Sequence, residues 1–166
     1  MELEERVAAL ERRLAALEGA DGGTRPVGGG ELWALQRLKE ELAEAGYPNG
    51  GVLYTGSVRL PTEERYEWQY GTFADQLLDA DWSQTAESFA ALGHGVRLRL
   101  LREILGGRRT AAELAELDDI GTTGQIYHHL RQLTGAGWLH TTGRGRYEVP
   151  GARVVPLLVM LSAARP

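Results

Sequence analysis

A chain of 166 residues is long enough for one ordinary domain or two small ones, and its lack of cysteine excludes disulfides, zinc ribbons, iron–sulfur clusters and a thiol nucleophile. The net charge of −5 combines −9 over residues 1–87 with +4 over residues 88–166. An anionic partner would therefore meet the second half, although a chance distribution of surface charge is the alternative. The charged start MELEERV lacks the apolar core of a signal peptide. The longest apolar run, residues 154–164, contains a proline and is shorter than the roughly 20 residues of a membrane helix. We therefore expect a cytoplasmic protein that does not contact a membrane.

Residues 1–18 are predicted to form a coiled-coil helix. Apolar residues recur there at alternating spacings of four and three, which is the pattern of a coiled-coil seam. The seam residues are Leu3, Val7, Leu10, Leu14 and Leu17. A helix of about two heptads is marginal in water, so it needs a partner. Pairing with a second copy in a homodimer is one possibility, and packing back onto its own chain is the other.

Half of the next stretch, residues 19–30, is glycine, which predicts a flexible linker. Residues 31–85 are expected to form a helix and a β-hairpin. The helix should cover residues 31–45, with leucines on one stripe, and end at Gly46. Two strands should follow at about 51–60 and 65–70, around the turn LPTEER. Short helices are then expected at 73–80 and 83–92.

Aromatic residues are concentrated in the predicted hairpin. Because a two-stranded hairpin is unstable alone, we expect these rings to pack it onto helices. A pocket for a small organic ligand is the alternative. Its candidate lining residues are Tyr54, Tyr66, Trp68 and Tyr70.

Residues 86–150 carry the pattern of a winged helix-turn-helix domain. An apolar helix face runs through LGHGVRLRLLREIL and ends at Gly106-Gly107. Thr110 with Glu113 and Thr122 with Gln125 are capping boxes, which predict helices from 110 to about 117 and from 122 to about 134. The stretch WLHTT-GRG-RYEV then predicts two short strands around a glycine turn, the wing.

The second of these helices has two unlike faces. Ile126, Leu130 and Leu133 form a core face, whereas the opposite face is polar and suits a DNA major groove. The helix N-terminus favours a phosphate, and an arginine at the wing tip can enter a minor groove or hold a phosphate. An ordinary polar surface is the alternative. The predicted DNA-binding residues are Thr122, Thr123, Gly124, Gln125, Tyr127, His128, Arg131, Arg144 and Arg146.

The adjacent histidines His128 and His129 raise the question of a metal site. Neighbours on a helix point about 100° apart, whereas zinc pairs on a helix use i, i+4 spacing. No acidic residue or cysteine stands at a helical spacing that would complete a site, so we expect neither a metal nor a cofactor. His128 is expected to face DNA, and His129 to be half-buried with a hydrogen-bond partner. Serine is scarce and there is no phosphate-binding P-loop, so an enzyme is not expected.

Four motifs together resemble the ArsR-type winged-helix transcriptional regulators. They are ALGHGVRLRLLREIL, RTAAELAEL, TTGQIYHHLRQLTGAGWL and GRGRYEV, and the resemblance covers about residues 86–164. It implies a homodimer that binds a palindromic operator in double-stranded DNA, usually as a repressor. It also implies that Thr123, Gly124, Gln125, Tyr127 and His128 lie at DNA-reading positions.

The resemblance further implies dimerisation through terminal helices. The apolar tail, residues 151–166, is predicted to be such a helix, packed on another element or on another subunit. Its candidate dimerisation residues are Val155, Leu158 and Val159. The chain departs from the family at its metal sites, because ELAELDDI has no cysteine and VVPLLVMLSAA has no ligand. The family's metal chemistry is therefore not expected.

The predicted fold is mostly α with a small β component. A winged helix-turn-helix domain is preceded by a coiled-coil helix, a glycine-rich linker and a helix plus β-hairpin segment. The predicted function is sequence-specific transcriptional regulation. Two alternatives stay open, since a fold does not settle a function. The winged helix could be a scaffold for protein interaction, or the regulator could sense a small organic ligand through its aromatic hairpin.

Overall fold

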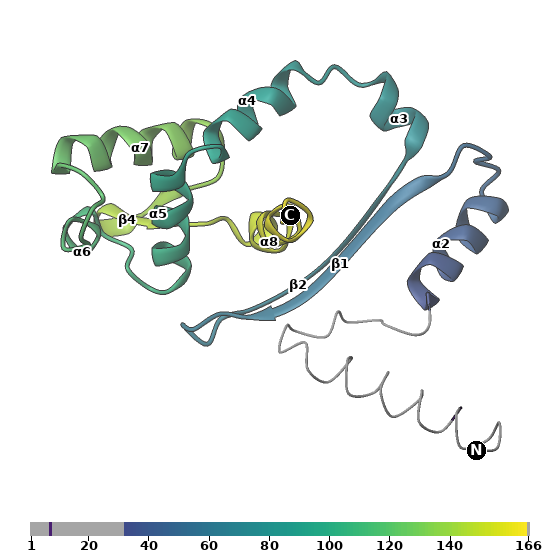
Figure 1. Ribbon diagram of the computed structural model, residues 1–166, viewed down its shortest axis with the longest axis horizontal. Coiled ribbons are helices and arrows are strands. Elements are labelled where there is room, and N and C mark those ends of the chain that lie inside the picture. The colour runs from purple at the N-terminus through teal and green to yellow at the C-terminus, as the bar shows by residue number, and fades with distance from the viewer. Residues whose placement is uncertain (1–6, 8–31, 166) are drawn as a thin grey trace. The chain divides into compact units, whose positions relative to one another are not determined.

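The computed structural model describes Val7 and residues 32–165 (Figure 1). The chain divides into two compact units, Met1–Ala45 and Gly46–Pro166. The predicted linker and all of the predicted coiled coil except Val7 lie outside the described residues. Val7 is helical and about half exposed.

The first unit contributes helix α2 (Trp33–Glu44), which confirms the helix predicted for this stretch. The backbone at Gly46 has φ of +75°, a conformation that suits glycine and ends a helix. None of the residues of α2 is buried, and Leu32, Trp33 and Leu35 are exposed. The leucine stripe is therefore only partly covered.

The second unit begins with the predicted hairpin, β1 (Gly51–Arg59) and β2 (Arg65–Phe73), which pair antiparallel. The second strand is longer than predicted, because its last three residues continue the ladder opposite residues 51–53. At the turn, Leu60 is buried and Glu63 has φ of +69°. The hairpin tip is thus anchored to the apolar core.

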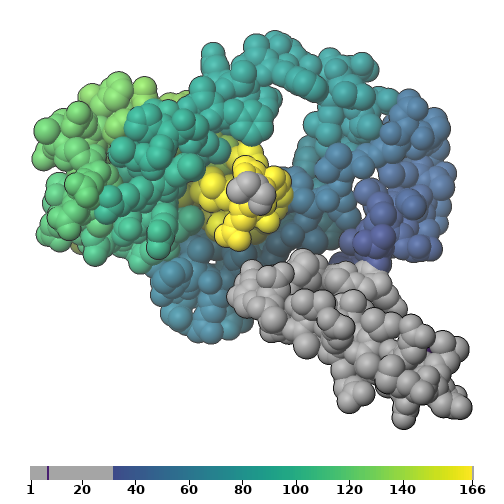
Figure 2. All heavy atoms as spheres, in the orientation of Figure 1, coloured from purple at the N-terminus to yellow at the C-terminus, as the bar shows by residue number. Residues whose placement is uncertain are grey.

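The C-terminal helix α8 (Gly151–Ala163) packs on both hairpin strands, as Figure 2 shows for the yellow helix beside the blue hairpin. Gly56 permits the contact: a Cβ there would lie 2.6 Å from Cγ1 of Val155. Val154, Val155 and Leu157 are at most 2% exposed. The predicted burial of the apolar tail is therefore satisfied within the chain.

Between hairpin and tail helix lie α3 (Ala74–Asp79), α4 (Ser83–Leu92), α5 (Gly95–Leu105), α6 (Ala111–Ala115) and α7 (Thr123–Gly135), followed by β3 (His140–Thr142) and β4 (Arg146–Glu148). This order is that of a winged helix-turn-helix, and the short helices predicted at 73–80 and 83–92 are confirmed as α3 and α4. No helix in residues 32–165 is long and apolar enough to span a membrane.

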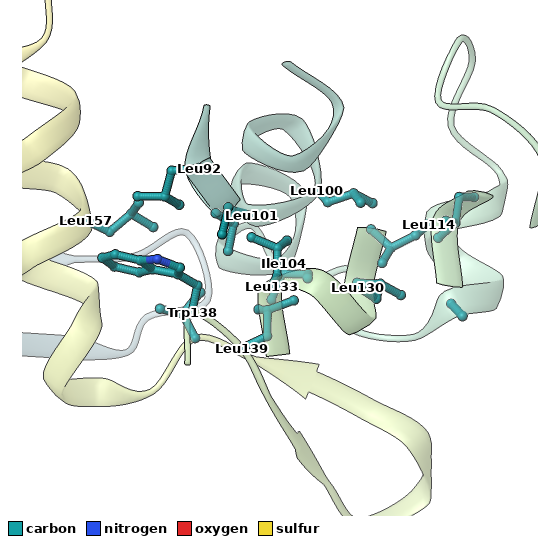
Figure 3. Close-up of a cluster of buried hydrophobic side chains, with 14 of the residues drawn as sticks. Leu92, Leu100, Leu101, Ile104, Leu114, Leu130, Leu133, Trp138, Leu139 and Leu157 are labelled. Carbon is teal, nitrogen blue, oxygen red and sulfur yellow. The ribbon is translucent and has the colours of Figure 1, made fainter. Parts of the chain in front are cut away.

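The core of the winged helix is built from leucine and isoleucine side chains of α5, α6 and α7 that converge on one another (Figure 3). Burying one such side chain completely contributes about 1.5–3 kcal/mol. Trp138 connects this core to two further helices. Its indole Nε1 donates to Ser88 Oγ of α4 at 3.0 Å, and the Arg153 guanidinium of α8 lies 4.9 Å from its ring centroid. The winged helix, α4 and α8 therefore share one core.

Candidate nucleic-acid interface

The start of α7 is fixed by the second predicted capping box. Thr122 Oγ1 accepts a hydrogen bond from the Gln125 backbone N–H at 3.3 Å, and Gln125 Oε1 accepts one from the Thr122 backbone N–H at 2.8 Å. The first capping box, Thr110 with Glu113 at the start of α6, is also present. Both helix starts are therefore confirmed, and they define the helix-turn-helix.

The two faces of α7 are oriented as the sequence predicts. Ile126, Leu130 and Leu133 have no exposed surface. The opposite side, with Thr123, Gly124, Tyr127, His128 and Arg131, is exposed to solvent. The large side chain of Tyr127, for example, is 45% exposed. A continuous polar surface about three turns long is thus available to a partner.

Arg131 and Arg144 are the two arginines best placed for a phosphate or a base. Arg131 is exposed on α7 and forms no ion pair with the residues that the structure describes. Arg144 is exposed at the wing tip, in the left-handed backbone region with φ of +66°. Both side chains can reach an anionic ligand without first breaking a salt bridge.

Gln125 is predicted both to cap α7 and to contact DNA, and the structure shows the cap. In the capping box its side-chain carbonyl accepts one hydrogen bond, so a second lone pair of that oxygen and the amide NH2 remain. Bidentate recognition of adenine by glutamine requires both groups. Gln125 therefore caps the helix, and its contact with a base stays a prediction.

Arg146 also differs from Arg144. It begins β4 directly after the wing turn, where it pairs with Thr142, and it is half-buried and forms a β-bridge with Thr110. The pKa of Glu113 is lowered mainly by hydrogen bonds from Thr110, then by one from the Arg109 N–H, and also by the positive charge of Arg146. Arg146 therefore faces the start of α6 as well as solvent.

Arg97 of α5 joins three helices. Its guanidinium donates to the carbonyls of Ala90 and Ala91 at the end of α4 and to Gln132 Oε1 on α7. Gln132 is thus engaged within the chain. The sequence does not single out this contact, because one arginine among several on α5 has no periodicity that marks it as half-buried.

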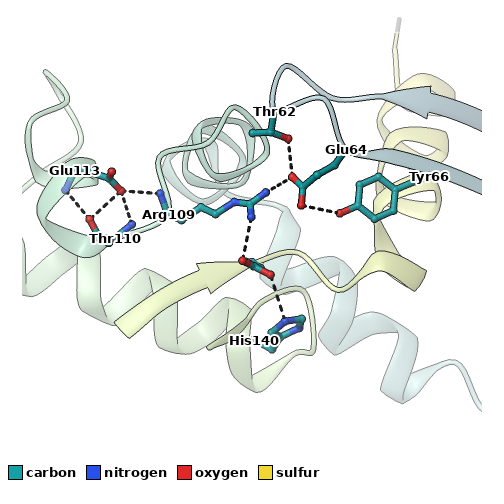
Figure 4. A network of polar contacts seen from close by, with 8 residues as sticks. Thr62, Glu64, Tyr66, Arg109, Thr110, Glu113 and His140 are labelled. Carbon is teal, nitrogen blue, oxygen red and sulfur yellow. Dashed lines mark hydrogen bonds and ion pairs between the residues drawn. The ribbon is translucent and has the colours of Figure 1, made fainter. Parts of the chain in front are cut away.

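Arg109 holds the wing to the hairpin tip (Figure 4). Its guanidinium pairs with Glu64 and with Glu148, the latter at 3.0 Å, and its backbone carbonyl accepts from the Tyr147 N–H at 2.7 Å. The Thr62 hydroxyl donates to Glu64 at 2.6 Å. The pKa of Glu64 is lowered, first by the Thr62 hydrogen bond and then by Arg109. This network was not predictable from the sequence, because its members are far apart in the chain.

The two adjacent histidines have separate environments, as expected. His128 is exposed, whereas His129 is half-buried with its ring 4.8 Å from that of His94. His94 caps α5, its Nδ1 accepting from the Val96 N–H at 3.2 Å. The hydrogen-bond partner expected for His129 is missing, since its buried Nδ1 has none among the described residues. Within residues 32–165, no three potential ligands gather around a metal position.

Burial and neighbouring positive charge disfavour the protonated form of His129. Its pKa is lowered from 6.5, first by burial and then by the charges of His94, Arg97 and His128.

The four aromatic residues of the predicted ligand pocket do not surround one cavity. Tyr66 packs against the core, while Trp68 and Tyr70 are 38% and 50% exposed. Tyr54 lines a groove of about 580 Å³ together with Phe89, Trp138 and Val159 among others, whereas Trp68 lines a different and smaller hollow of about 370 Å³. The rings share one face of the hairpin, and α8 covers part of that face. The alternative expectation, that they pack the hairpin onto helices, describes Tyr66 and Tyr54 better.

The three tail residues predicted to mediate dimerisation lie in different environments. Val155 is buried against Gly56 of its own chain and is not available to a second copy. Leu158 and Val159 are half-buried on opposite flanks of α8, where they line two different grooves.

Comparison with protein families adds one finding. Residues 92–141 match the model of a helix-turn-helix domain, the kind of domain that DNA-binding transcription regulators carry. The match runs from the end of α4 to the first wing strand and covers less than half of the chain. No match was found among the curated proteins or among the solved structures.

Proposed function

We propose that this chain is a sequence-specific transcriptional regulator that binds double-stranded DNA as a homodimer, as a repressor of the ArsR type without a metal site. The helix α7 would enter the major groove of each half of a palindromic operator. The wing would follow the adjacent backbone or minor groove.

The observation that carries the proposal is the exposed face of α7 next to a charged wing. Arg131 on the helix and Arg144 at the wing tip are both exposed and free of acidic partners within the described part of the chain. Arginines of this kind hold phosphates and read guanine edges. The +4 charge of residues 88–166 has the sign that DNA requires.

Dimerisation is supported by two features. The heptad seam of Leu3, Val7, Leu10, Leu14 and Leu17 suits pairing with a second copy. The second unit also exposes large apolar side chains on and between α3 and α4, namely Leu78, Trp82 and Phe89 at 68%, 61% and 57%. Apolar side chains exposed together often mark an interface. On α8, Val159 borders the same groove as Phe89 and is retained as an interface residue.

The test is DNA binding by paired variants. A binding sequence is first selected from random duplexes with the intact protein, and affinity is then measured by fluorescence anisotropy. Arg131→Ala and Arg144→Ala should each weaken binding by about 1–3 kcal/mol, roughly 5- to 150-fold. Arg144→Ala should also lower the salt dependence by about one unit of slope if Arg144 holds a phosphate.

Arg37→Ala is the matched control, because Arg37 lies on α2 in the other unit and pairs with Glu41. Thermal unfolding should show all three variants folded. Unchanged affinity in both test variants, or failure of the intact protein to enrich any sequence, would contradict the proposal. A stable protein partner without DNA enrichment would instead favour an interaction module.

A further inference from the structure

A second groove lies on the flank of α8 that carries Leu158, separate from the groove that Val159 borders. It has a volume of about 770 Å³ and is formed by the hairpin tip, α5 and the C-terminal half of α8. Its walls are mostly leucine, including Leu60, Leu105 and Leu158. Leu161 at its edge is 39% exposed. Small-molecule sites have volumes of about 300–1,000 Å³ and mostly apolar walls, so this groove is in the usual range.

Two arginines of α5 border this apolar groove. Arg99 and Arg102 both line it, and neither forms an ion pair or a side-chain hydrogen bond with the residues that the structure describes. The one acidic residue in the lining, Glu103, lies 3.7 Å from Arg108. The groove therefore offers unneutralised positive charge beside a leucine surface.

We propose that this groove binds an amphipathic organic anion, with an acyl or aryl body and a terminal carboxylate. The leucine walls would take the apolar body out of water. The arginines would hold the carboxylate through charge-assisted hydrogen bonds, for which the guanidinium geometry is suited. A neutral or cationic ligand of the same length would leave the two arginines without a counter-charge.

The groove is connected to the candidate DNA-binding elements by contacts already described. Its α5 wall packs through Leu101 and Ile104 into the core that also holds α7. At its other wall, the hairpin tip continues into Glu64, which pairs with Arg109, and Arg109 pairs with Glu148 of the wing. A ligand that moves the hairpin tip relative to α5 would therefore act on both α7 and the wing. This coupling rests on the proposed function, whereas ligand binding itself does not.

The first measurement is calorimetric titration of the full-length protein with three probes: decanoate and decyltrimethylammonium, each below its critical micelle concentration, and acetate. Decanoate should bind at one saturable site. Decyltrimethylammonium should bind at least ~10-fold more weakly, because it lacks the anion, and acetate should not bind, because it lacks the apolar chain. Equal binding of decanoate and its cationic counterpart, or no saturable binding, would overturn the proposal.

Variants locate the site. The double variant Arg99→Gln/Arg102→Gln should weaken decanoate binding at least ~10-fold. Leu161→Asp should also weaken it, because it places a carboxylate at the apolar edge of the groove. Arg37→Gln, on α2, should leave it unchanged. Both arginines are at least partly exposed, so the double variant should retain its thermal unfolding transition. An unchanged decanoate affinity in the double variant would sink the idea. So would a loss of oligomer mass in Leu161→Asp without any probe binding, because the groove would then be an interface between copies.

The second measurement separates the ligand site from the proposed function. Decanoate should change the affinity for the selected DNA in the intact protein, and Glu64→Gln should reduce this change while decanoate still binds. Decanoate binding with unaltered DNA affinity would reject the coupling and support the site. Decanoate binding by a protein that selects no DNA would reject the proposed function and still support the site.

Discussion

His129 has surroundings that disfavour its protonated form. Its Nδ1 is buried and has no hydrogen-bond partner in the described part of the chain, and His94, Arg97 and His128 place positive charge near it. The orientation of the His129 side chain was predictable from the sequence, because neighbours on a helix point about 100° apart. Its lack of a hydrogen-bond partner was not predictable, because this depends on how α5 places His94 against the His129 ring.

The lowered pKa of His129 predicts a pH dependence of stability. In the unfolded chain the imidazole of His129 binds a proton near pH 6.5, whereas in the folded chain it does so only at lower pH. The unfolded state therefore holds more protons in this window, and the free energy of unfolding should fall as the pH drops below about 6.5. In His129→Leu the fall should be smaller. Thermal unfolding of both proteins at pH 5, 6, 7 and 8 measures it. An equal slope in the two proteins would show that other groups cause the dependence.

At the scale of elements, the contact between α8 and the hairpin depends on a glycine. A Cβ at position 56 would lie 2.6 Å from Val155, which is closer than real Cβ contacts. Gly56→Ala should therefore destabilise the protein by about 1–3 kcal/mol through overpacking. Adding Val155→Ala should recover part of this loss, since it removes the clashing methyl groups.

Denaturant unfolding of both single variants and the double variant forms a double-mutant cycle. Gly71→Ala is a control in the same hairpin, because a Cβ at position 71 would lie 3.4 Å from the Leu53 Cδ1, which is an ordinary contact distance. Additive effects of the two substitutions at positions 56 and 155 would contradict a direct contact.

Local signals explain which elements could be predicted. Both capping boxes act within four residues, so the starts of α6 and α7 follow from the sequence. The apolar tail was recognisable as a helix, but not its position on the hairpin, because Gly56 and Val155 are almost a hundred residues apart. The Arg109 network escaped for the same reason. Gln125 was predicted in two roles, and only the structure shows that capping already uses its carbonyl.

At the scale of the whole molecule, the seam of residues 3–17 is expected to set the oligomeric state. Leu10→Asp would place a carboxylate in an apolar seam, which is unfavourable without a partner charge. The variant should therefore dissociate at concentrations where the intact protein is dimeric. Light scattering over a dilution series measures this, with Ala9→Asp, outside the seam, as the matched control. An unchanged mass for Leu10→Asp would refute the role of the seam.

The capping of α7 by Gln125 has a consequence for how a genome would be searched. Gly124 has no side chain and Gln125 also caps the helix, so few side chains on this face are devoted to distinguishing bases at each half-site. A short base sequence occurs many times by chance among the roughly 10⁶–10⁹ competing sites of a genome. Under the proposed function, a homodimer would recognise two copies of the same half-site. The spacing between the two copies of α7 would then add to the specificity, because it fixes the distance between the half-sites.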